Sequence, residues 1–361
     1  MLGGKTVSIL IPCFNHEKFV EKAIYSALEQ ENIDFEILIS DDCSTDGSKE
    51  IISRIKDPRI QTFFFQENHG VVYALNYLMR KSCGKYIAFL GSDDAFKKEK
   101  LQKQVEILER NPNVGAVFTH VEVIDQDGCP YEDDEMINHE LFQNKNETRA
   151  QWMRLFFEKG NQFCHSSALI RRSVYEQIGE YQQIFRQLHD FDYWIRVLRQ
   201  WDVYVLQEKL TQYRRVKTNN KSISAELDEN TIRLYNEYAM IFSEMFRWMP
   251  ENLLREGFKD FFDRSLEMQT ERARYEILTH LRIAGNKVPM ASFIYLYSIY
   301  DRSGRKSIFS DAELNESIYL NTGQKAMNYG FGIKKELKEI MVRIGKRMRG
   351  GRNNGGKYTN G

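Results

Sequence analysis

Three short acidic stretches are the residues of this 361-residue chain that could carry out chemistry: Asp41-Asp42, Ser92-Asp93-Asp94 and His189-Asp190-Phe191-Asp192. The first two each follow an apolar run that is typical of a buried strand. In an open α/β sheet, residues just past the carboxyl ends of strands line the ligand crevice. Carboxylates gathered at such an edge repel one another unless a cation or a sugar hydroxyl balances them. The arrangement therefore suggests a metal–diphosphate site.

The elements that must position these stretches alternate between strand and helix patterns over the first 120 residues. Runs that predict buried strands occupy 7–11, 35–40, 60–65, 86–91 and 114–119, and amphipathic helical runs separate the first four and precede the fifth. Strands separated by helices of this length indicate βαβ units. The sequence therefore predicts an α/β fold with a mainly parallel, twisted sheet and flanking helices.

After Val121 the pattern loosens, and the expected elements become shorter. We expect a turn at 125–128, a loop over 131–146, helices over 152–158, from Ser173 and over 190–201, and strands over 165–170, 203–206 and 209–214. From about Glu226 strand signals become rare, so residues 226–349 are predicted to form a helical C-terminal region. Residues 350–361 are of low complexity and are expected to be disordered.

Composition and charge exclude several classes of protein. The chain has 51 basic and 51 acidic residues, so its net charge offers no general attraction to nucleic acid. Its five cysteines are scattered without a Cys-x-x-Cys pair, which argues against a disulfide framework or zinc site and favours a reducing cytosol. The first residues lead into a strand without a signal-peptide pattern, and the apolar stretch 289–300 is too short to cross a bilayer. We expect a cytoplasmic protein.

Each of the first two acidic stretches has a structural alternative. Ser92-Asp93-Asp94 could cap the helix that follows, and Asp41-Asp42 could form a turn ahead of a helix. The functional interpretation is that one carboxylate binds Mg²⁺ or Mn²⁺ and another accepts hydrogen bonds from a base or ribose. The glycine-rich dinucleotide fingerprint and the Walker loop are both absent from the sequence, so a metal must handle the phosphates.

Four motifs, in order, resemble the inverting family 2 glycosyltransferases of the GT-A fold. They occupy 7–15, 39–47, 68–76 and 93–94, and the resemblance extends over about residues 5–225. It implies a GT-A catalytic domain over 1–225 and a nucleotide-diphosphate sugar as donor. By match to the family, the donor nucleotide site comprises Pro12, Phe14, Asn15, Asp42, Asn68, Gly70, Ser92 and Asp93, and Asp94 is the ligand of Mn²⁺ or Mg²⁺.

The resemblance also implies a catalytic base. In that family the base is the Asp of a Glu-Asp pair that opens a helix, and here Asp190 takes that position. The dipole of the helix would keep this carboxylate ionised and able to accept a proton. The alternatives are that Asp190 only caps its helix and that Asp192 is the base. Two departures affect neighbouring contacts, since His189 replaces the usual Glu and Leu75 stands where many relatives have Arg.

Three further features have a functional and a structural interpretation. Arg214 lies in a segment that resembles the family's loop over the donor diphosphate, but a solvated basic loop would look the same. His165 precedes an expected strand on the acceptor side, where a core or capping role is the better interpretation. Residues 334–349 predict a basic amphipathic helix that could rest on an anionic membrane or dock on the core.

Together these features predict a metal-dependent inverting glycosyltransferase that transfers a sugar to a hydroxyl of a glycan or lipid-linked acceptor. The resemblance places it in the synthesis of surface polysaccharide, O-antigen or capsule, with peripheral contact on the inner face of the plasma membrane as a further expectation. A nucleotidyltransferase remains an alternative, although no glycine-rich triphosphate loop is visible near the first strand. A catalytically silent carbohydrate-binding scaffold is the other, and the three acidic motifs argue against it.

Overall fold

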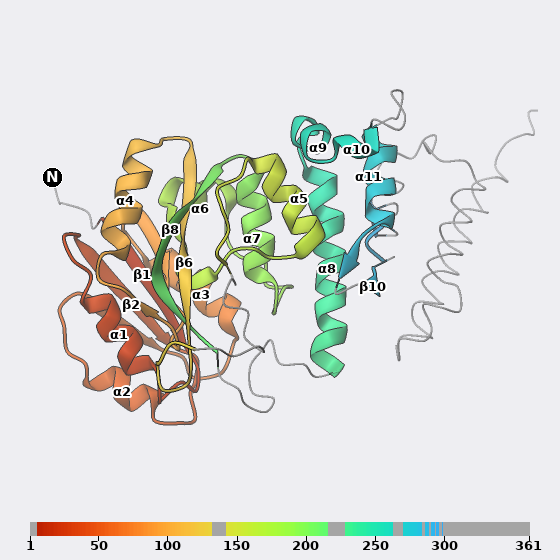
Figure 1. Cartoon of the computed structure of the whole chain (residues 1–361). Coiled ribbons are helices and arrows are strands. Elements are labelled where there is room, and N and C mark those ends of the chain that lie inside the picture. The colour runs from red at the N-terminus through yellow and green to blue at the C-terminus, as the bar shows by residue number, and fades with distance from the viewer. Residues whose placement is uncertain are drawn as a thin grey trace, which may run out of the picture. The chain divides into compact units, whose positions relative to one another are not determined.

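The computed structural model describes residues 6–131, 142–215, 228–262, 270–283 and 286–288, together with 290–292, 294, 295 and 298. Its centre is an eight-stranded sheet in the order β3-β2-β1-β4-β7-β6-β8-β5 (Figure 1). The strands are β1 (Val7–Cys13), β2 (Phe35–Asp41), β3 (Ile60–Phe64), β4 (Tyr86–Phe89), β5 (Ala95–Phe96), β6 (Val114–Ile124), β7 (Leu169–Arg171) and β8 (Asp202–Arg214). The pairs β1–β2, β2–β3, β1–β4 and β6–β8 are parallel. Strand β7 pairs antiparallel with β4 and β6, and β5 with β8, so the sheet is mixed but mostly parallel.

Helices cover both faces of this sheet because its strands are apolar on both sides. The helices of this part are α1 (Val20–Leu28), α2 (Ser48–Arg54), α3 (Val71–Lys81), α4 (Lys100–Arg110), α5 (Arg149–Lys159), α6 (Arg172–Ile178) and α7 (His189–Leu198). Along β1, Ile9 and Ile11 belong to the core shared with α1 and α4, whereas Leu10 belongs to the core shared with α3, α5 and α7. This alternation follows from the two-residue period of a strand.

The structure differs from the expected elements in three places. The strand expected over 165–170 is a 3-10 turn at His165–Ser167 followed by the short strand β7. The two strands expected over 203–206 and 209–214 are one continuous strand, β8, which shifts register against β6 near His120. The two-residue strand β5, which closes the sheet edge beside β8, was not predicted, because so short a run carries no periodic signal.

The later helices share a core with α5 and α7. They are α8 (Asp228–Trp248), α9 (Glu251–Gly257), α10 (Lys259–Phe262) and α11 (Thr270–Thr279). Phe242 and Phe246 of α8 pack with Phe157 of α5, and Phe242 also contacts Phe191 of α7. The region was predicted to be helical throughout, but β9 (Arg282–Ile283) and β10 (Asn286–Lys287) form a short antiparallel pair. Because α8 packs on α7, it can influence the residues at the start of that helix.

Several predictions for the end of the chain lie outside the described residues. These are the basic amphipathic helix over 334–349 and the disordered tail over 350–361. The boundary between a catalytic domain and a helical region near residue 225 stays a prediction. Among the described helices, none is both long enough and apolar enough to cross a bilayer.

Candidate active site

Asp42, at the end of β2, holds the loop that leads into α3. Its Oδ1 accepts a hydrogen bond from the N–H of His69 at 2.9 Å, and its Oδ2 accepts one from the N–H of Gly70 at 2.7 Å. Asn68 donates through Nδ2 to the Asp42 carbonyl oxygen at 3.2 Å. Gly70 has φ +86°, a conformation that glycine adopts without the strain a side chain would cause. Three predicted donor-site residues, Asp42, Asn68 and Gly70, are thus joined in one small network.

A second loop, after β1, lies against the loop after β2. The Asn15 N–H donates to Ser44 Oγ at 2.9 Å, and Asn15 Oδ1 accepts from the N–H of Thr45 at 2.8 Å. These bonds hold Asn15 at φ +54°. Phe14 leaves 43% of its surface exposed, although it is a large apolar residue, and Pro12 lies within β1. The predicted residues Pro12, Phe14 and Asn15 therefore line the same edge of the sheet as Asp42.

The stretch Ser92-Asp93-Asp94 follows β4 and does not cap the next helix. Helix α4 begins at Lys100, and its N-cap, Glu99, accepts no capping hydrogen bond, so the structural alternative for this stretch is wrong. Ser92 is buried and its hydroxyl contacts His16 Nδ1 at 2.7 Å. Asp93 is partly exposed, whereas Asp94 is buried.

Both oxygens of Asp94 are held by protein donors. Oδ1 accepts from the N–H of Arg214 at 2.8 Å, and Oδ2 accepts from the hydroxyl of Ser166. Burial, and after it the charge of Asp93, raise the pKa of the Asp94 carboxyl above its usual value. Two adjacent carboxylates of this kind are stabilised as anions by a nearby cation.

The Asp93–Asp94 pair has the chemistry of a Mg²⁺ or Mn²⁺ site, but it supplies few protein ligands. Carboxylate oxygens are the ligands these cations prefer, and each Asp94 oxygen keeps a lone pair beyond the hydrogen bond it accepts. Within the described part of the chain, no cluster of three or more His, Cys, Asp or Glu side chains is placed to hold a metal. A cation at this pair would therefore complete its coordination with oxygens of water or of a bound diphosphate.

Arg214 ends the strand predicted over 209–214, so the alternative of a solvated basic loop is wrong at this residue. It is the last residue of β8 and is only 6% exposed. Its guanidinium donates to the carbonyl oxygens of Asp93, Asp125 and Gln126 and lies 4.6 Å from the centre of the Phe19 ring. Arg214 therefore ties the Asp93–Asp94 backbone to the turn after β6. The rest of the predicted loop, from residue 216, lies outside the described residues.

Replacing Arg214 by Lys should destabilise this corner although the charge is kept. One ammonium cannot reach three carbonyl oxygens in different directions, and each lost charged hydrogen bond costs about 1.5–3 kcal/mol. We expect the free energy of unfolding in urea to fall by about 2–4 kcal/mol. The control is Arg215→Lys, next to it, whose side chain is exposed. Equal stability of the two variants would contradict this role of Arg214.

Asp190 lies in the first turn of α7. Its Oδ2 accepts a hydrogen bond from Asn161 Nδ2 at 2.9 Å, and its Oδ1 accepts from the N–H of Phe191 at 2.8 Å. The helix N-terminus was expected to keep Asp190 charged. Burial instead raises the pKa of its carboxyl, although the charge of His189 and these two hydrogen bonds act in the opposite direction. The sequence could not predict this, because the aromatic side chains around Asp190 come from distant segments.

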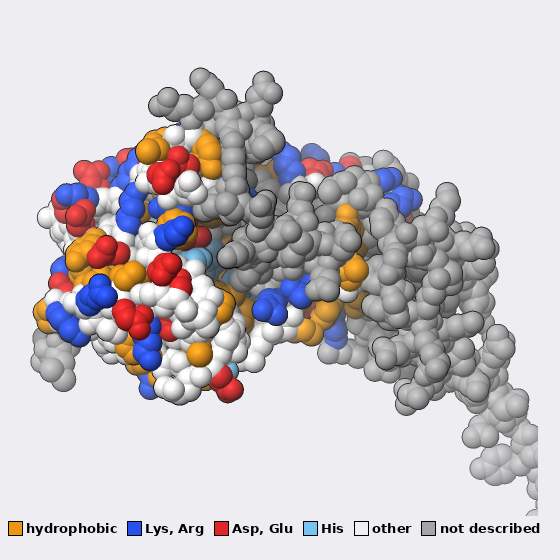
Figure 2. All heavy atoms as spheres, turned by 90° about the horizontal axis from the view of Figure 1, so that it is seen from below, with side chains coloured by type: hydrophobic (Ala, Val, Ile, Leu, Met, Phe, Trp, Pro, Cys, Tyr) orange, Lys and Arg blue, Asp and Glu red, His pale blue; other side chains and the backbone are white. Residues whose placement is uncertain are grey.

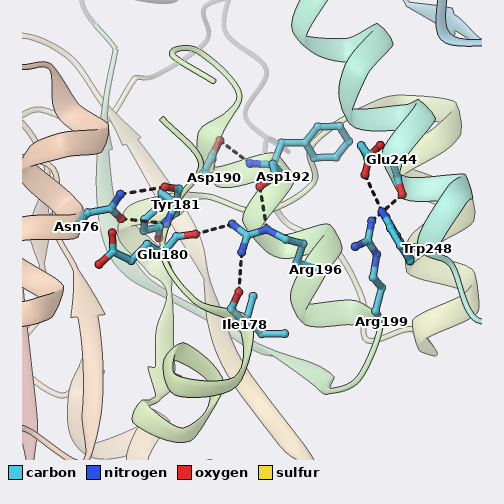
Figure 3. A network of polar contacts seen from close by, with 11 residues as sticks. Asn76, Ile178, Glu180, Tyr181, Asp190, Asp192, Arg196, Arg199, Glu244 and Trp248 are labelled. Atoms are coloured by element: carbon cyan, nitrogen blue, oxygen red, sulfur yellow. Dashed lines mark hydrogen bonds and ion pairs between the residues drawn. The ribbon is translucent and has the colours of Figure 1, made fainter. Parts of the chain in front are cut away.

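Asp192, the rival base, is held in an ion pair. Its Oδ2 accepts from Arg196 Nε at 2.9 Å, and the two side chains are 7% and 12% exposed. The same guanidinium donates to the carbonyl oxygens of Ile178 and Glu180, so it joins α7 to the segment after α6 (Figure 3). Asp192 is thus paired with a cationic side chain, whereas the side chain that donates to Asp190 is the neutral amide of Asn161.

His165 and His189 lie in an aromatic cluster next to Asp190. His165 Nε2 is 2.8 Å from the Tyr181 hydroxyl, and its ring lies 4.6 Å from that of Phe89 and 5.8 Å from that of His189. Burial lowers the pKa of His165, so this imidazole is neutral at neutral pH. His189 Nδ1 is buried and has no hydrogen-bond partner within the described residues. His165 therefore packs against these rings while it stays partly exposed, and its role stays a prediction, while His189 has one buried ring nitrogen without a partner among the described residues.

One short segment, residues 161–167, contacts both carboxylates, and its contact residues Asn161 and Ser166 were not predicted from the sequence. Asn161 donates to Asp190 and Ser166 donates to Asp94. Between them, Cys164 is buried, and besides burial the charges of Asp94 and Asp190 raise the pKa of its thiol. The segment therefore brings the second and third acidic stretches to one site. No residue spacing in it signals this role, because its contacts are made with strands and helices far away in the chain.

The described surface over this edge is of mixed character. Figure 2 views the molecule from the side on which β6 and β8 end, and some histidine side chains reach the surface there. Acidic, basic, apolar and uncharged polar side chains are interspersed over the visible described surface.

Comparison of the sequence with known proteins identifies its relatives. The model of glycosyl transferase family 2 matches residues 8–179. TuaG of Bacillus subtilis, whose name assigns it to teichuronic acid biosynthesis as a glycosyltransferase, is 31% identical over 236 residues, which are 64% of this chain and 87% of TuaG. An uncharacterized glycosyltransferase of Rickettsia typhi is 29% identical over 212 residues, which are 58% of this chain and 63% of the relative.

Solved structures share the fold. Residues 1–349 of S. aureus TarS, in complex with UDP-GlcNAc, align with a TM-score of 0.54 and 15% identity, over 84% of this chain and 94% of that one. The mannosyltransferase PcManGT of Pyrobaculum calidifontis, in complex with GDP-Man and Mn²⁺, aligns with a TM-score of 0.51 and 15% identity, over 91% and 84%. The predicted GT-A fold is thereby confirmed, and the chain is a glycosyltransferase that belongs to glycosyl transferase family 2.

Proposed function

We propose that this enzyme transfers a sugar from a nucleotide-diphosphate donor by a metal-dependent, inverting reaction. One observation carries the proposal: residues 161–167 contact both Asp94, at the edge of the parallel strands, and Asp190, at the start of α7. A donor diphosphate held at the first carboxylate and an acceptor hydroxyl at the second would meet over this segment. The bound nucleotide sugars of TarS and PcManGT support a donor of this class.

The donor nucleoside would bind over the loops after β1 and β2. The exposed ring of Phe14 offers a flat apolar surface for a base, and the neighbouring loop offers polar atoms of Asn15 and Asp42 for the base and ribose. Because Asp42 already accepts two backbone hydrogen bonds, it would contact the nucleoside through its remaining lone pairs. Asn68 and Gly70 would act by holding this carboxylate in place.

Asp93 and Asp94 would hold a Mn²⁺ or Mg²⁺ ion together with the diphosphate. Such an ion supplies a positive charge that stabilises the departing nucleoside diphosphate. Arg214 and Ser166 hold Asp94 in position through its two oxygens. Ser92, whose hydroxyl faces His16, would act through the loop after β1 rather than on the donor itself.

Asp190 would remove the proton from an acceptor hydroxyl as that oxygen attacks the anomeric carbon. The bond from the anomeric carbon to the diphosphate oxygen breaks in the same displacement, so the configuration inverts. The raised pKa of Asp190 makes its carboxylate a stronger base than an exposed aspartate. His189, which directly precedes Asp190, would hydrogen-bond the acceptor through its ring.

The biological setting is inferred from the relatives. TuaG is named for teichuronic acid biosynthesis, which supports a role in surface polysaccharide synthesis on a glycan or lipid-linked acceptor. Contact of residues 334–349 with an anionic membrane, and a cytoplasmic location, belong to the same proposal and rest on the sequence.

Metal dependence can be tested by titrating the protein with UDP-GlcNAc and GDP-mannose in a calorimeter, with Mn²⁺, with Mg²⁺ and with chelator. We expect the better donor to bind at least about tenfold more weakly with chelator, because the diphosphate then faces Asp93 and Asp94 without a cation. In Asp94→Asn, most of the increase in donor affinity that Mn²⁺ or Mg²⁺ causes should be lost. The control is Asp202→Asn, which changes an exposed aspartate at the start of β8 and should keep the full increase in donor affinity. Equal binding with metal and with chelator would reject the metal site.

A further inference from the structure

Glu237 of α8 holds the segment that leads into α7. It is 4% exposed, and its carboxylate accepts hydrogen bonds from three successive backbone N–H groups. The donors are Arg186 at 2.9 Å, Gln187 at 3.0 Å to Oε2, and Leu188 at 2.8 Å. A carboxylate that accepts three N–H bonds is among the stronger polar contacts a protein makes. These residues lie about 50 positions apart in the sequence, so the contact joins two separate parts of the chain.

Helix α7 has no cap of its own, and Glu237 supplies one. Leu188 is the N-cap residue of α7, and its side chain cannot accept a hydrogen bond. In a capping box a Glu of the same helix binds the N–H of the N-cap residue; here the Glu comes from another helix. A carboxylate at this end also interacts favourably with the helix dipole. The position of the first turn of α7 therefore depends on α8.

Asp190 lies in that first turn, two residues after Leu188. Its backbone is held on one side by Glu237 through Leu188, and its side chain on the other by Asn161. A shift of about 1 Å in a reacting group can lower a rate about 100-fold. The contact between Glu237 and residues 186–188 is thus close enough to Asp190 to affect catalysis without touching a substrate.

We propose that Glu237 is a positioning residue for the catalytic base: by capping α7 it sets where the Asp190 carboxylate meets the acceptor hydroxyl. The helical region that carries α8 is then part of the catalytic apparatus rather than an appendage. This inference rests on the proposed role of Asp190. Glu237 lies away from the donor loops after β1, β2 and β4, so its removal affects turnover and leaves donor binding intact.

The test measures the full chain with Mn²⁺ and UDP-GlcNAc or GDP-mannose, whichever binds, and follows release of the nucleoside diphosphate with water as acceptor. In Glu237→Gln we expect kcat to fall about tenfold while the donor KM changes less than about twofold, because only the base is displaced. Glu237→Asp, which keeps the charge, should recover part of the loss. The matched control is Glu244→Gln on the same helix; Glu244 binds Arg247 and Trp248 within α8, so kcat should stay unchanged.

Hydrogen exchange separates positioning from a merely structural role. The amides of residues 186–188 should be protected in the wild type and lose protection in Glu237→Gln along with the fall in kcat. Unprotected amides in the wild type, or lost protection with an unchanged kcat, would overturn the proposal. If Glu237→Gln does not fold, Glu237→Asp carries the same comparison. Asp190→Asn is measured in the same assay. If Asp190→Asn turns over normally, Asp190 is not the base. If Asp190→Asn loses turnover but Glu237→Gln does not, only the positioning role of Glu237 is rejected.

Discussion

Replacing Asp190 by Asn should abolish most turnover and at the same time remove one source of the pH dependence of stability. The amide cannot accept a proton from the acceptor, and loss of a general base lowers kcat by about 10²–10⁴-fold. Donor binding should stay within about twofold of the wild type, because Asp190 lies away from the loops after β1 and β2. The measurements are diphosphate release, calorimetric donor binding and the melting temperature of each protein.

The change in pH dependence follows from the direction of the pKa shift. Because burial raises the folded-state pKa of Asp190 above 3.8, the folded protein binds this proton more tightly than the unfolded chain does. The free energy of unfolding therefore falls as pH rises from about 3.8 through the folded pKa, and stays lower above it. Asn has no such proton, so the stability of the variant should lack this fall with pH.

The same shift predicts the pH dependence of the reaction. The base works only when deprotonated, so kcat/KM should rise with pH through a pKa above that of an ordinary aspartate and then level off. Asp202→Asn is the control for both effects, since it removes an exposed carboxylate and should change neither. A rate that stays high in Asp190→Asn would reject this residue as the base, and a melting temperature with the same pH dependence as the wild type would contradict the raised pKa.

Arg196→Met should cause the largest loss of stability among the variants considered. The change leaves the Asp192 carboxylate buried without its partner and removes donors from the carbonyl oxygens of Ile178 and Glu180. Breaking a buried ion pair on one side costs about 3–5 kcal/mol. We expect the free energy of unfolding in urea to fall by that amount, while an exposed pair on α4, probed by Arg110→Met, changes it by about 0.5 kcal/mol or less.

A second substitution identifies the cause of this loss. Adding Asp192→Asn to Arg196→Met removes the uncompensated charge, so part of the lost stability should return. If the double variant is as unstable as the single one, the lost bonds to the two carbonyl oxygens outweigh the buried charge. A single variant as stable as the wild type would show that the ion pair contributes nothing.

The parts of the fold that the sequence predicted are those with a strong local pattern. Strands β1, β2 and β4 are apolar runs followed by polar residues, so their carboxyl ends and the acidic stretches there could be placed without a structure. Strand β7, between β4 and β6, has three residues and no period to detect. Its antiparallel pairing depends on partners more than 50 residues away and could not be predicted.

In the candidate site, too, residues with a local sequence pattern were predicted, whereas residues that depend on distant partners were not. Asp94 and Asp190 were found because acidic residues at the ends of predicted elements stand out in a sequence. The end of β8 at Arg214 was predicted, but the contacts of its guanidinium were not, because the carbonyl oxygens it binds belong to segments far away in the chain. Asn161 and Glu237 were missed because an asparagine in a loop and a glutamate in a helix are common, and only the fold gives each its partner.

The segment over residues 161–167 has a consequence for how such enzymes can diverge. It contacts Asp94 at one end and Asp190 at the other, so it is one of the elements that set how far apart these two carboxylates lie. Inserting or deleting one residue there would alter the gap between leaving group and acceptor while both acidic motifs stayed identical in sequence. Family members that keep every acidic residue could thus differ in the size of the sugar they accommodate.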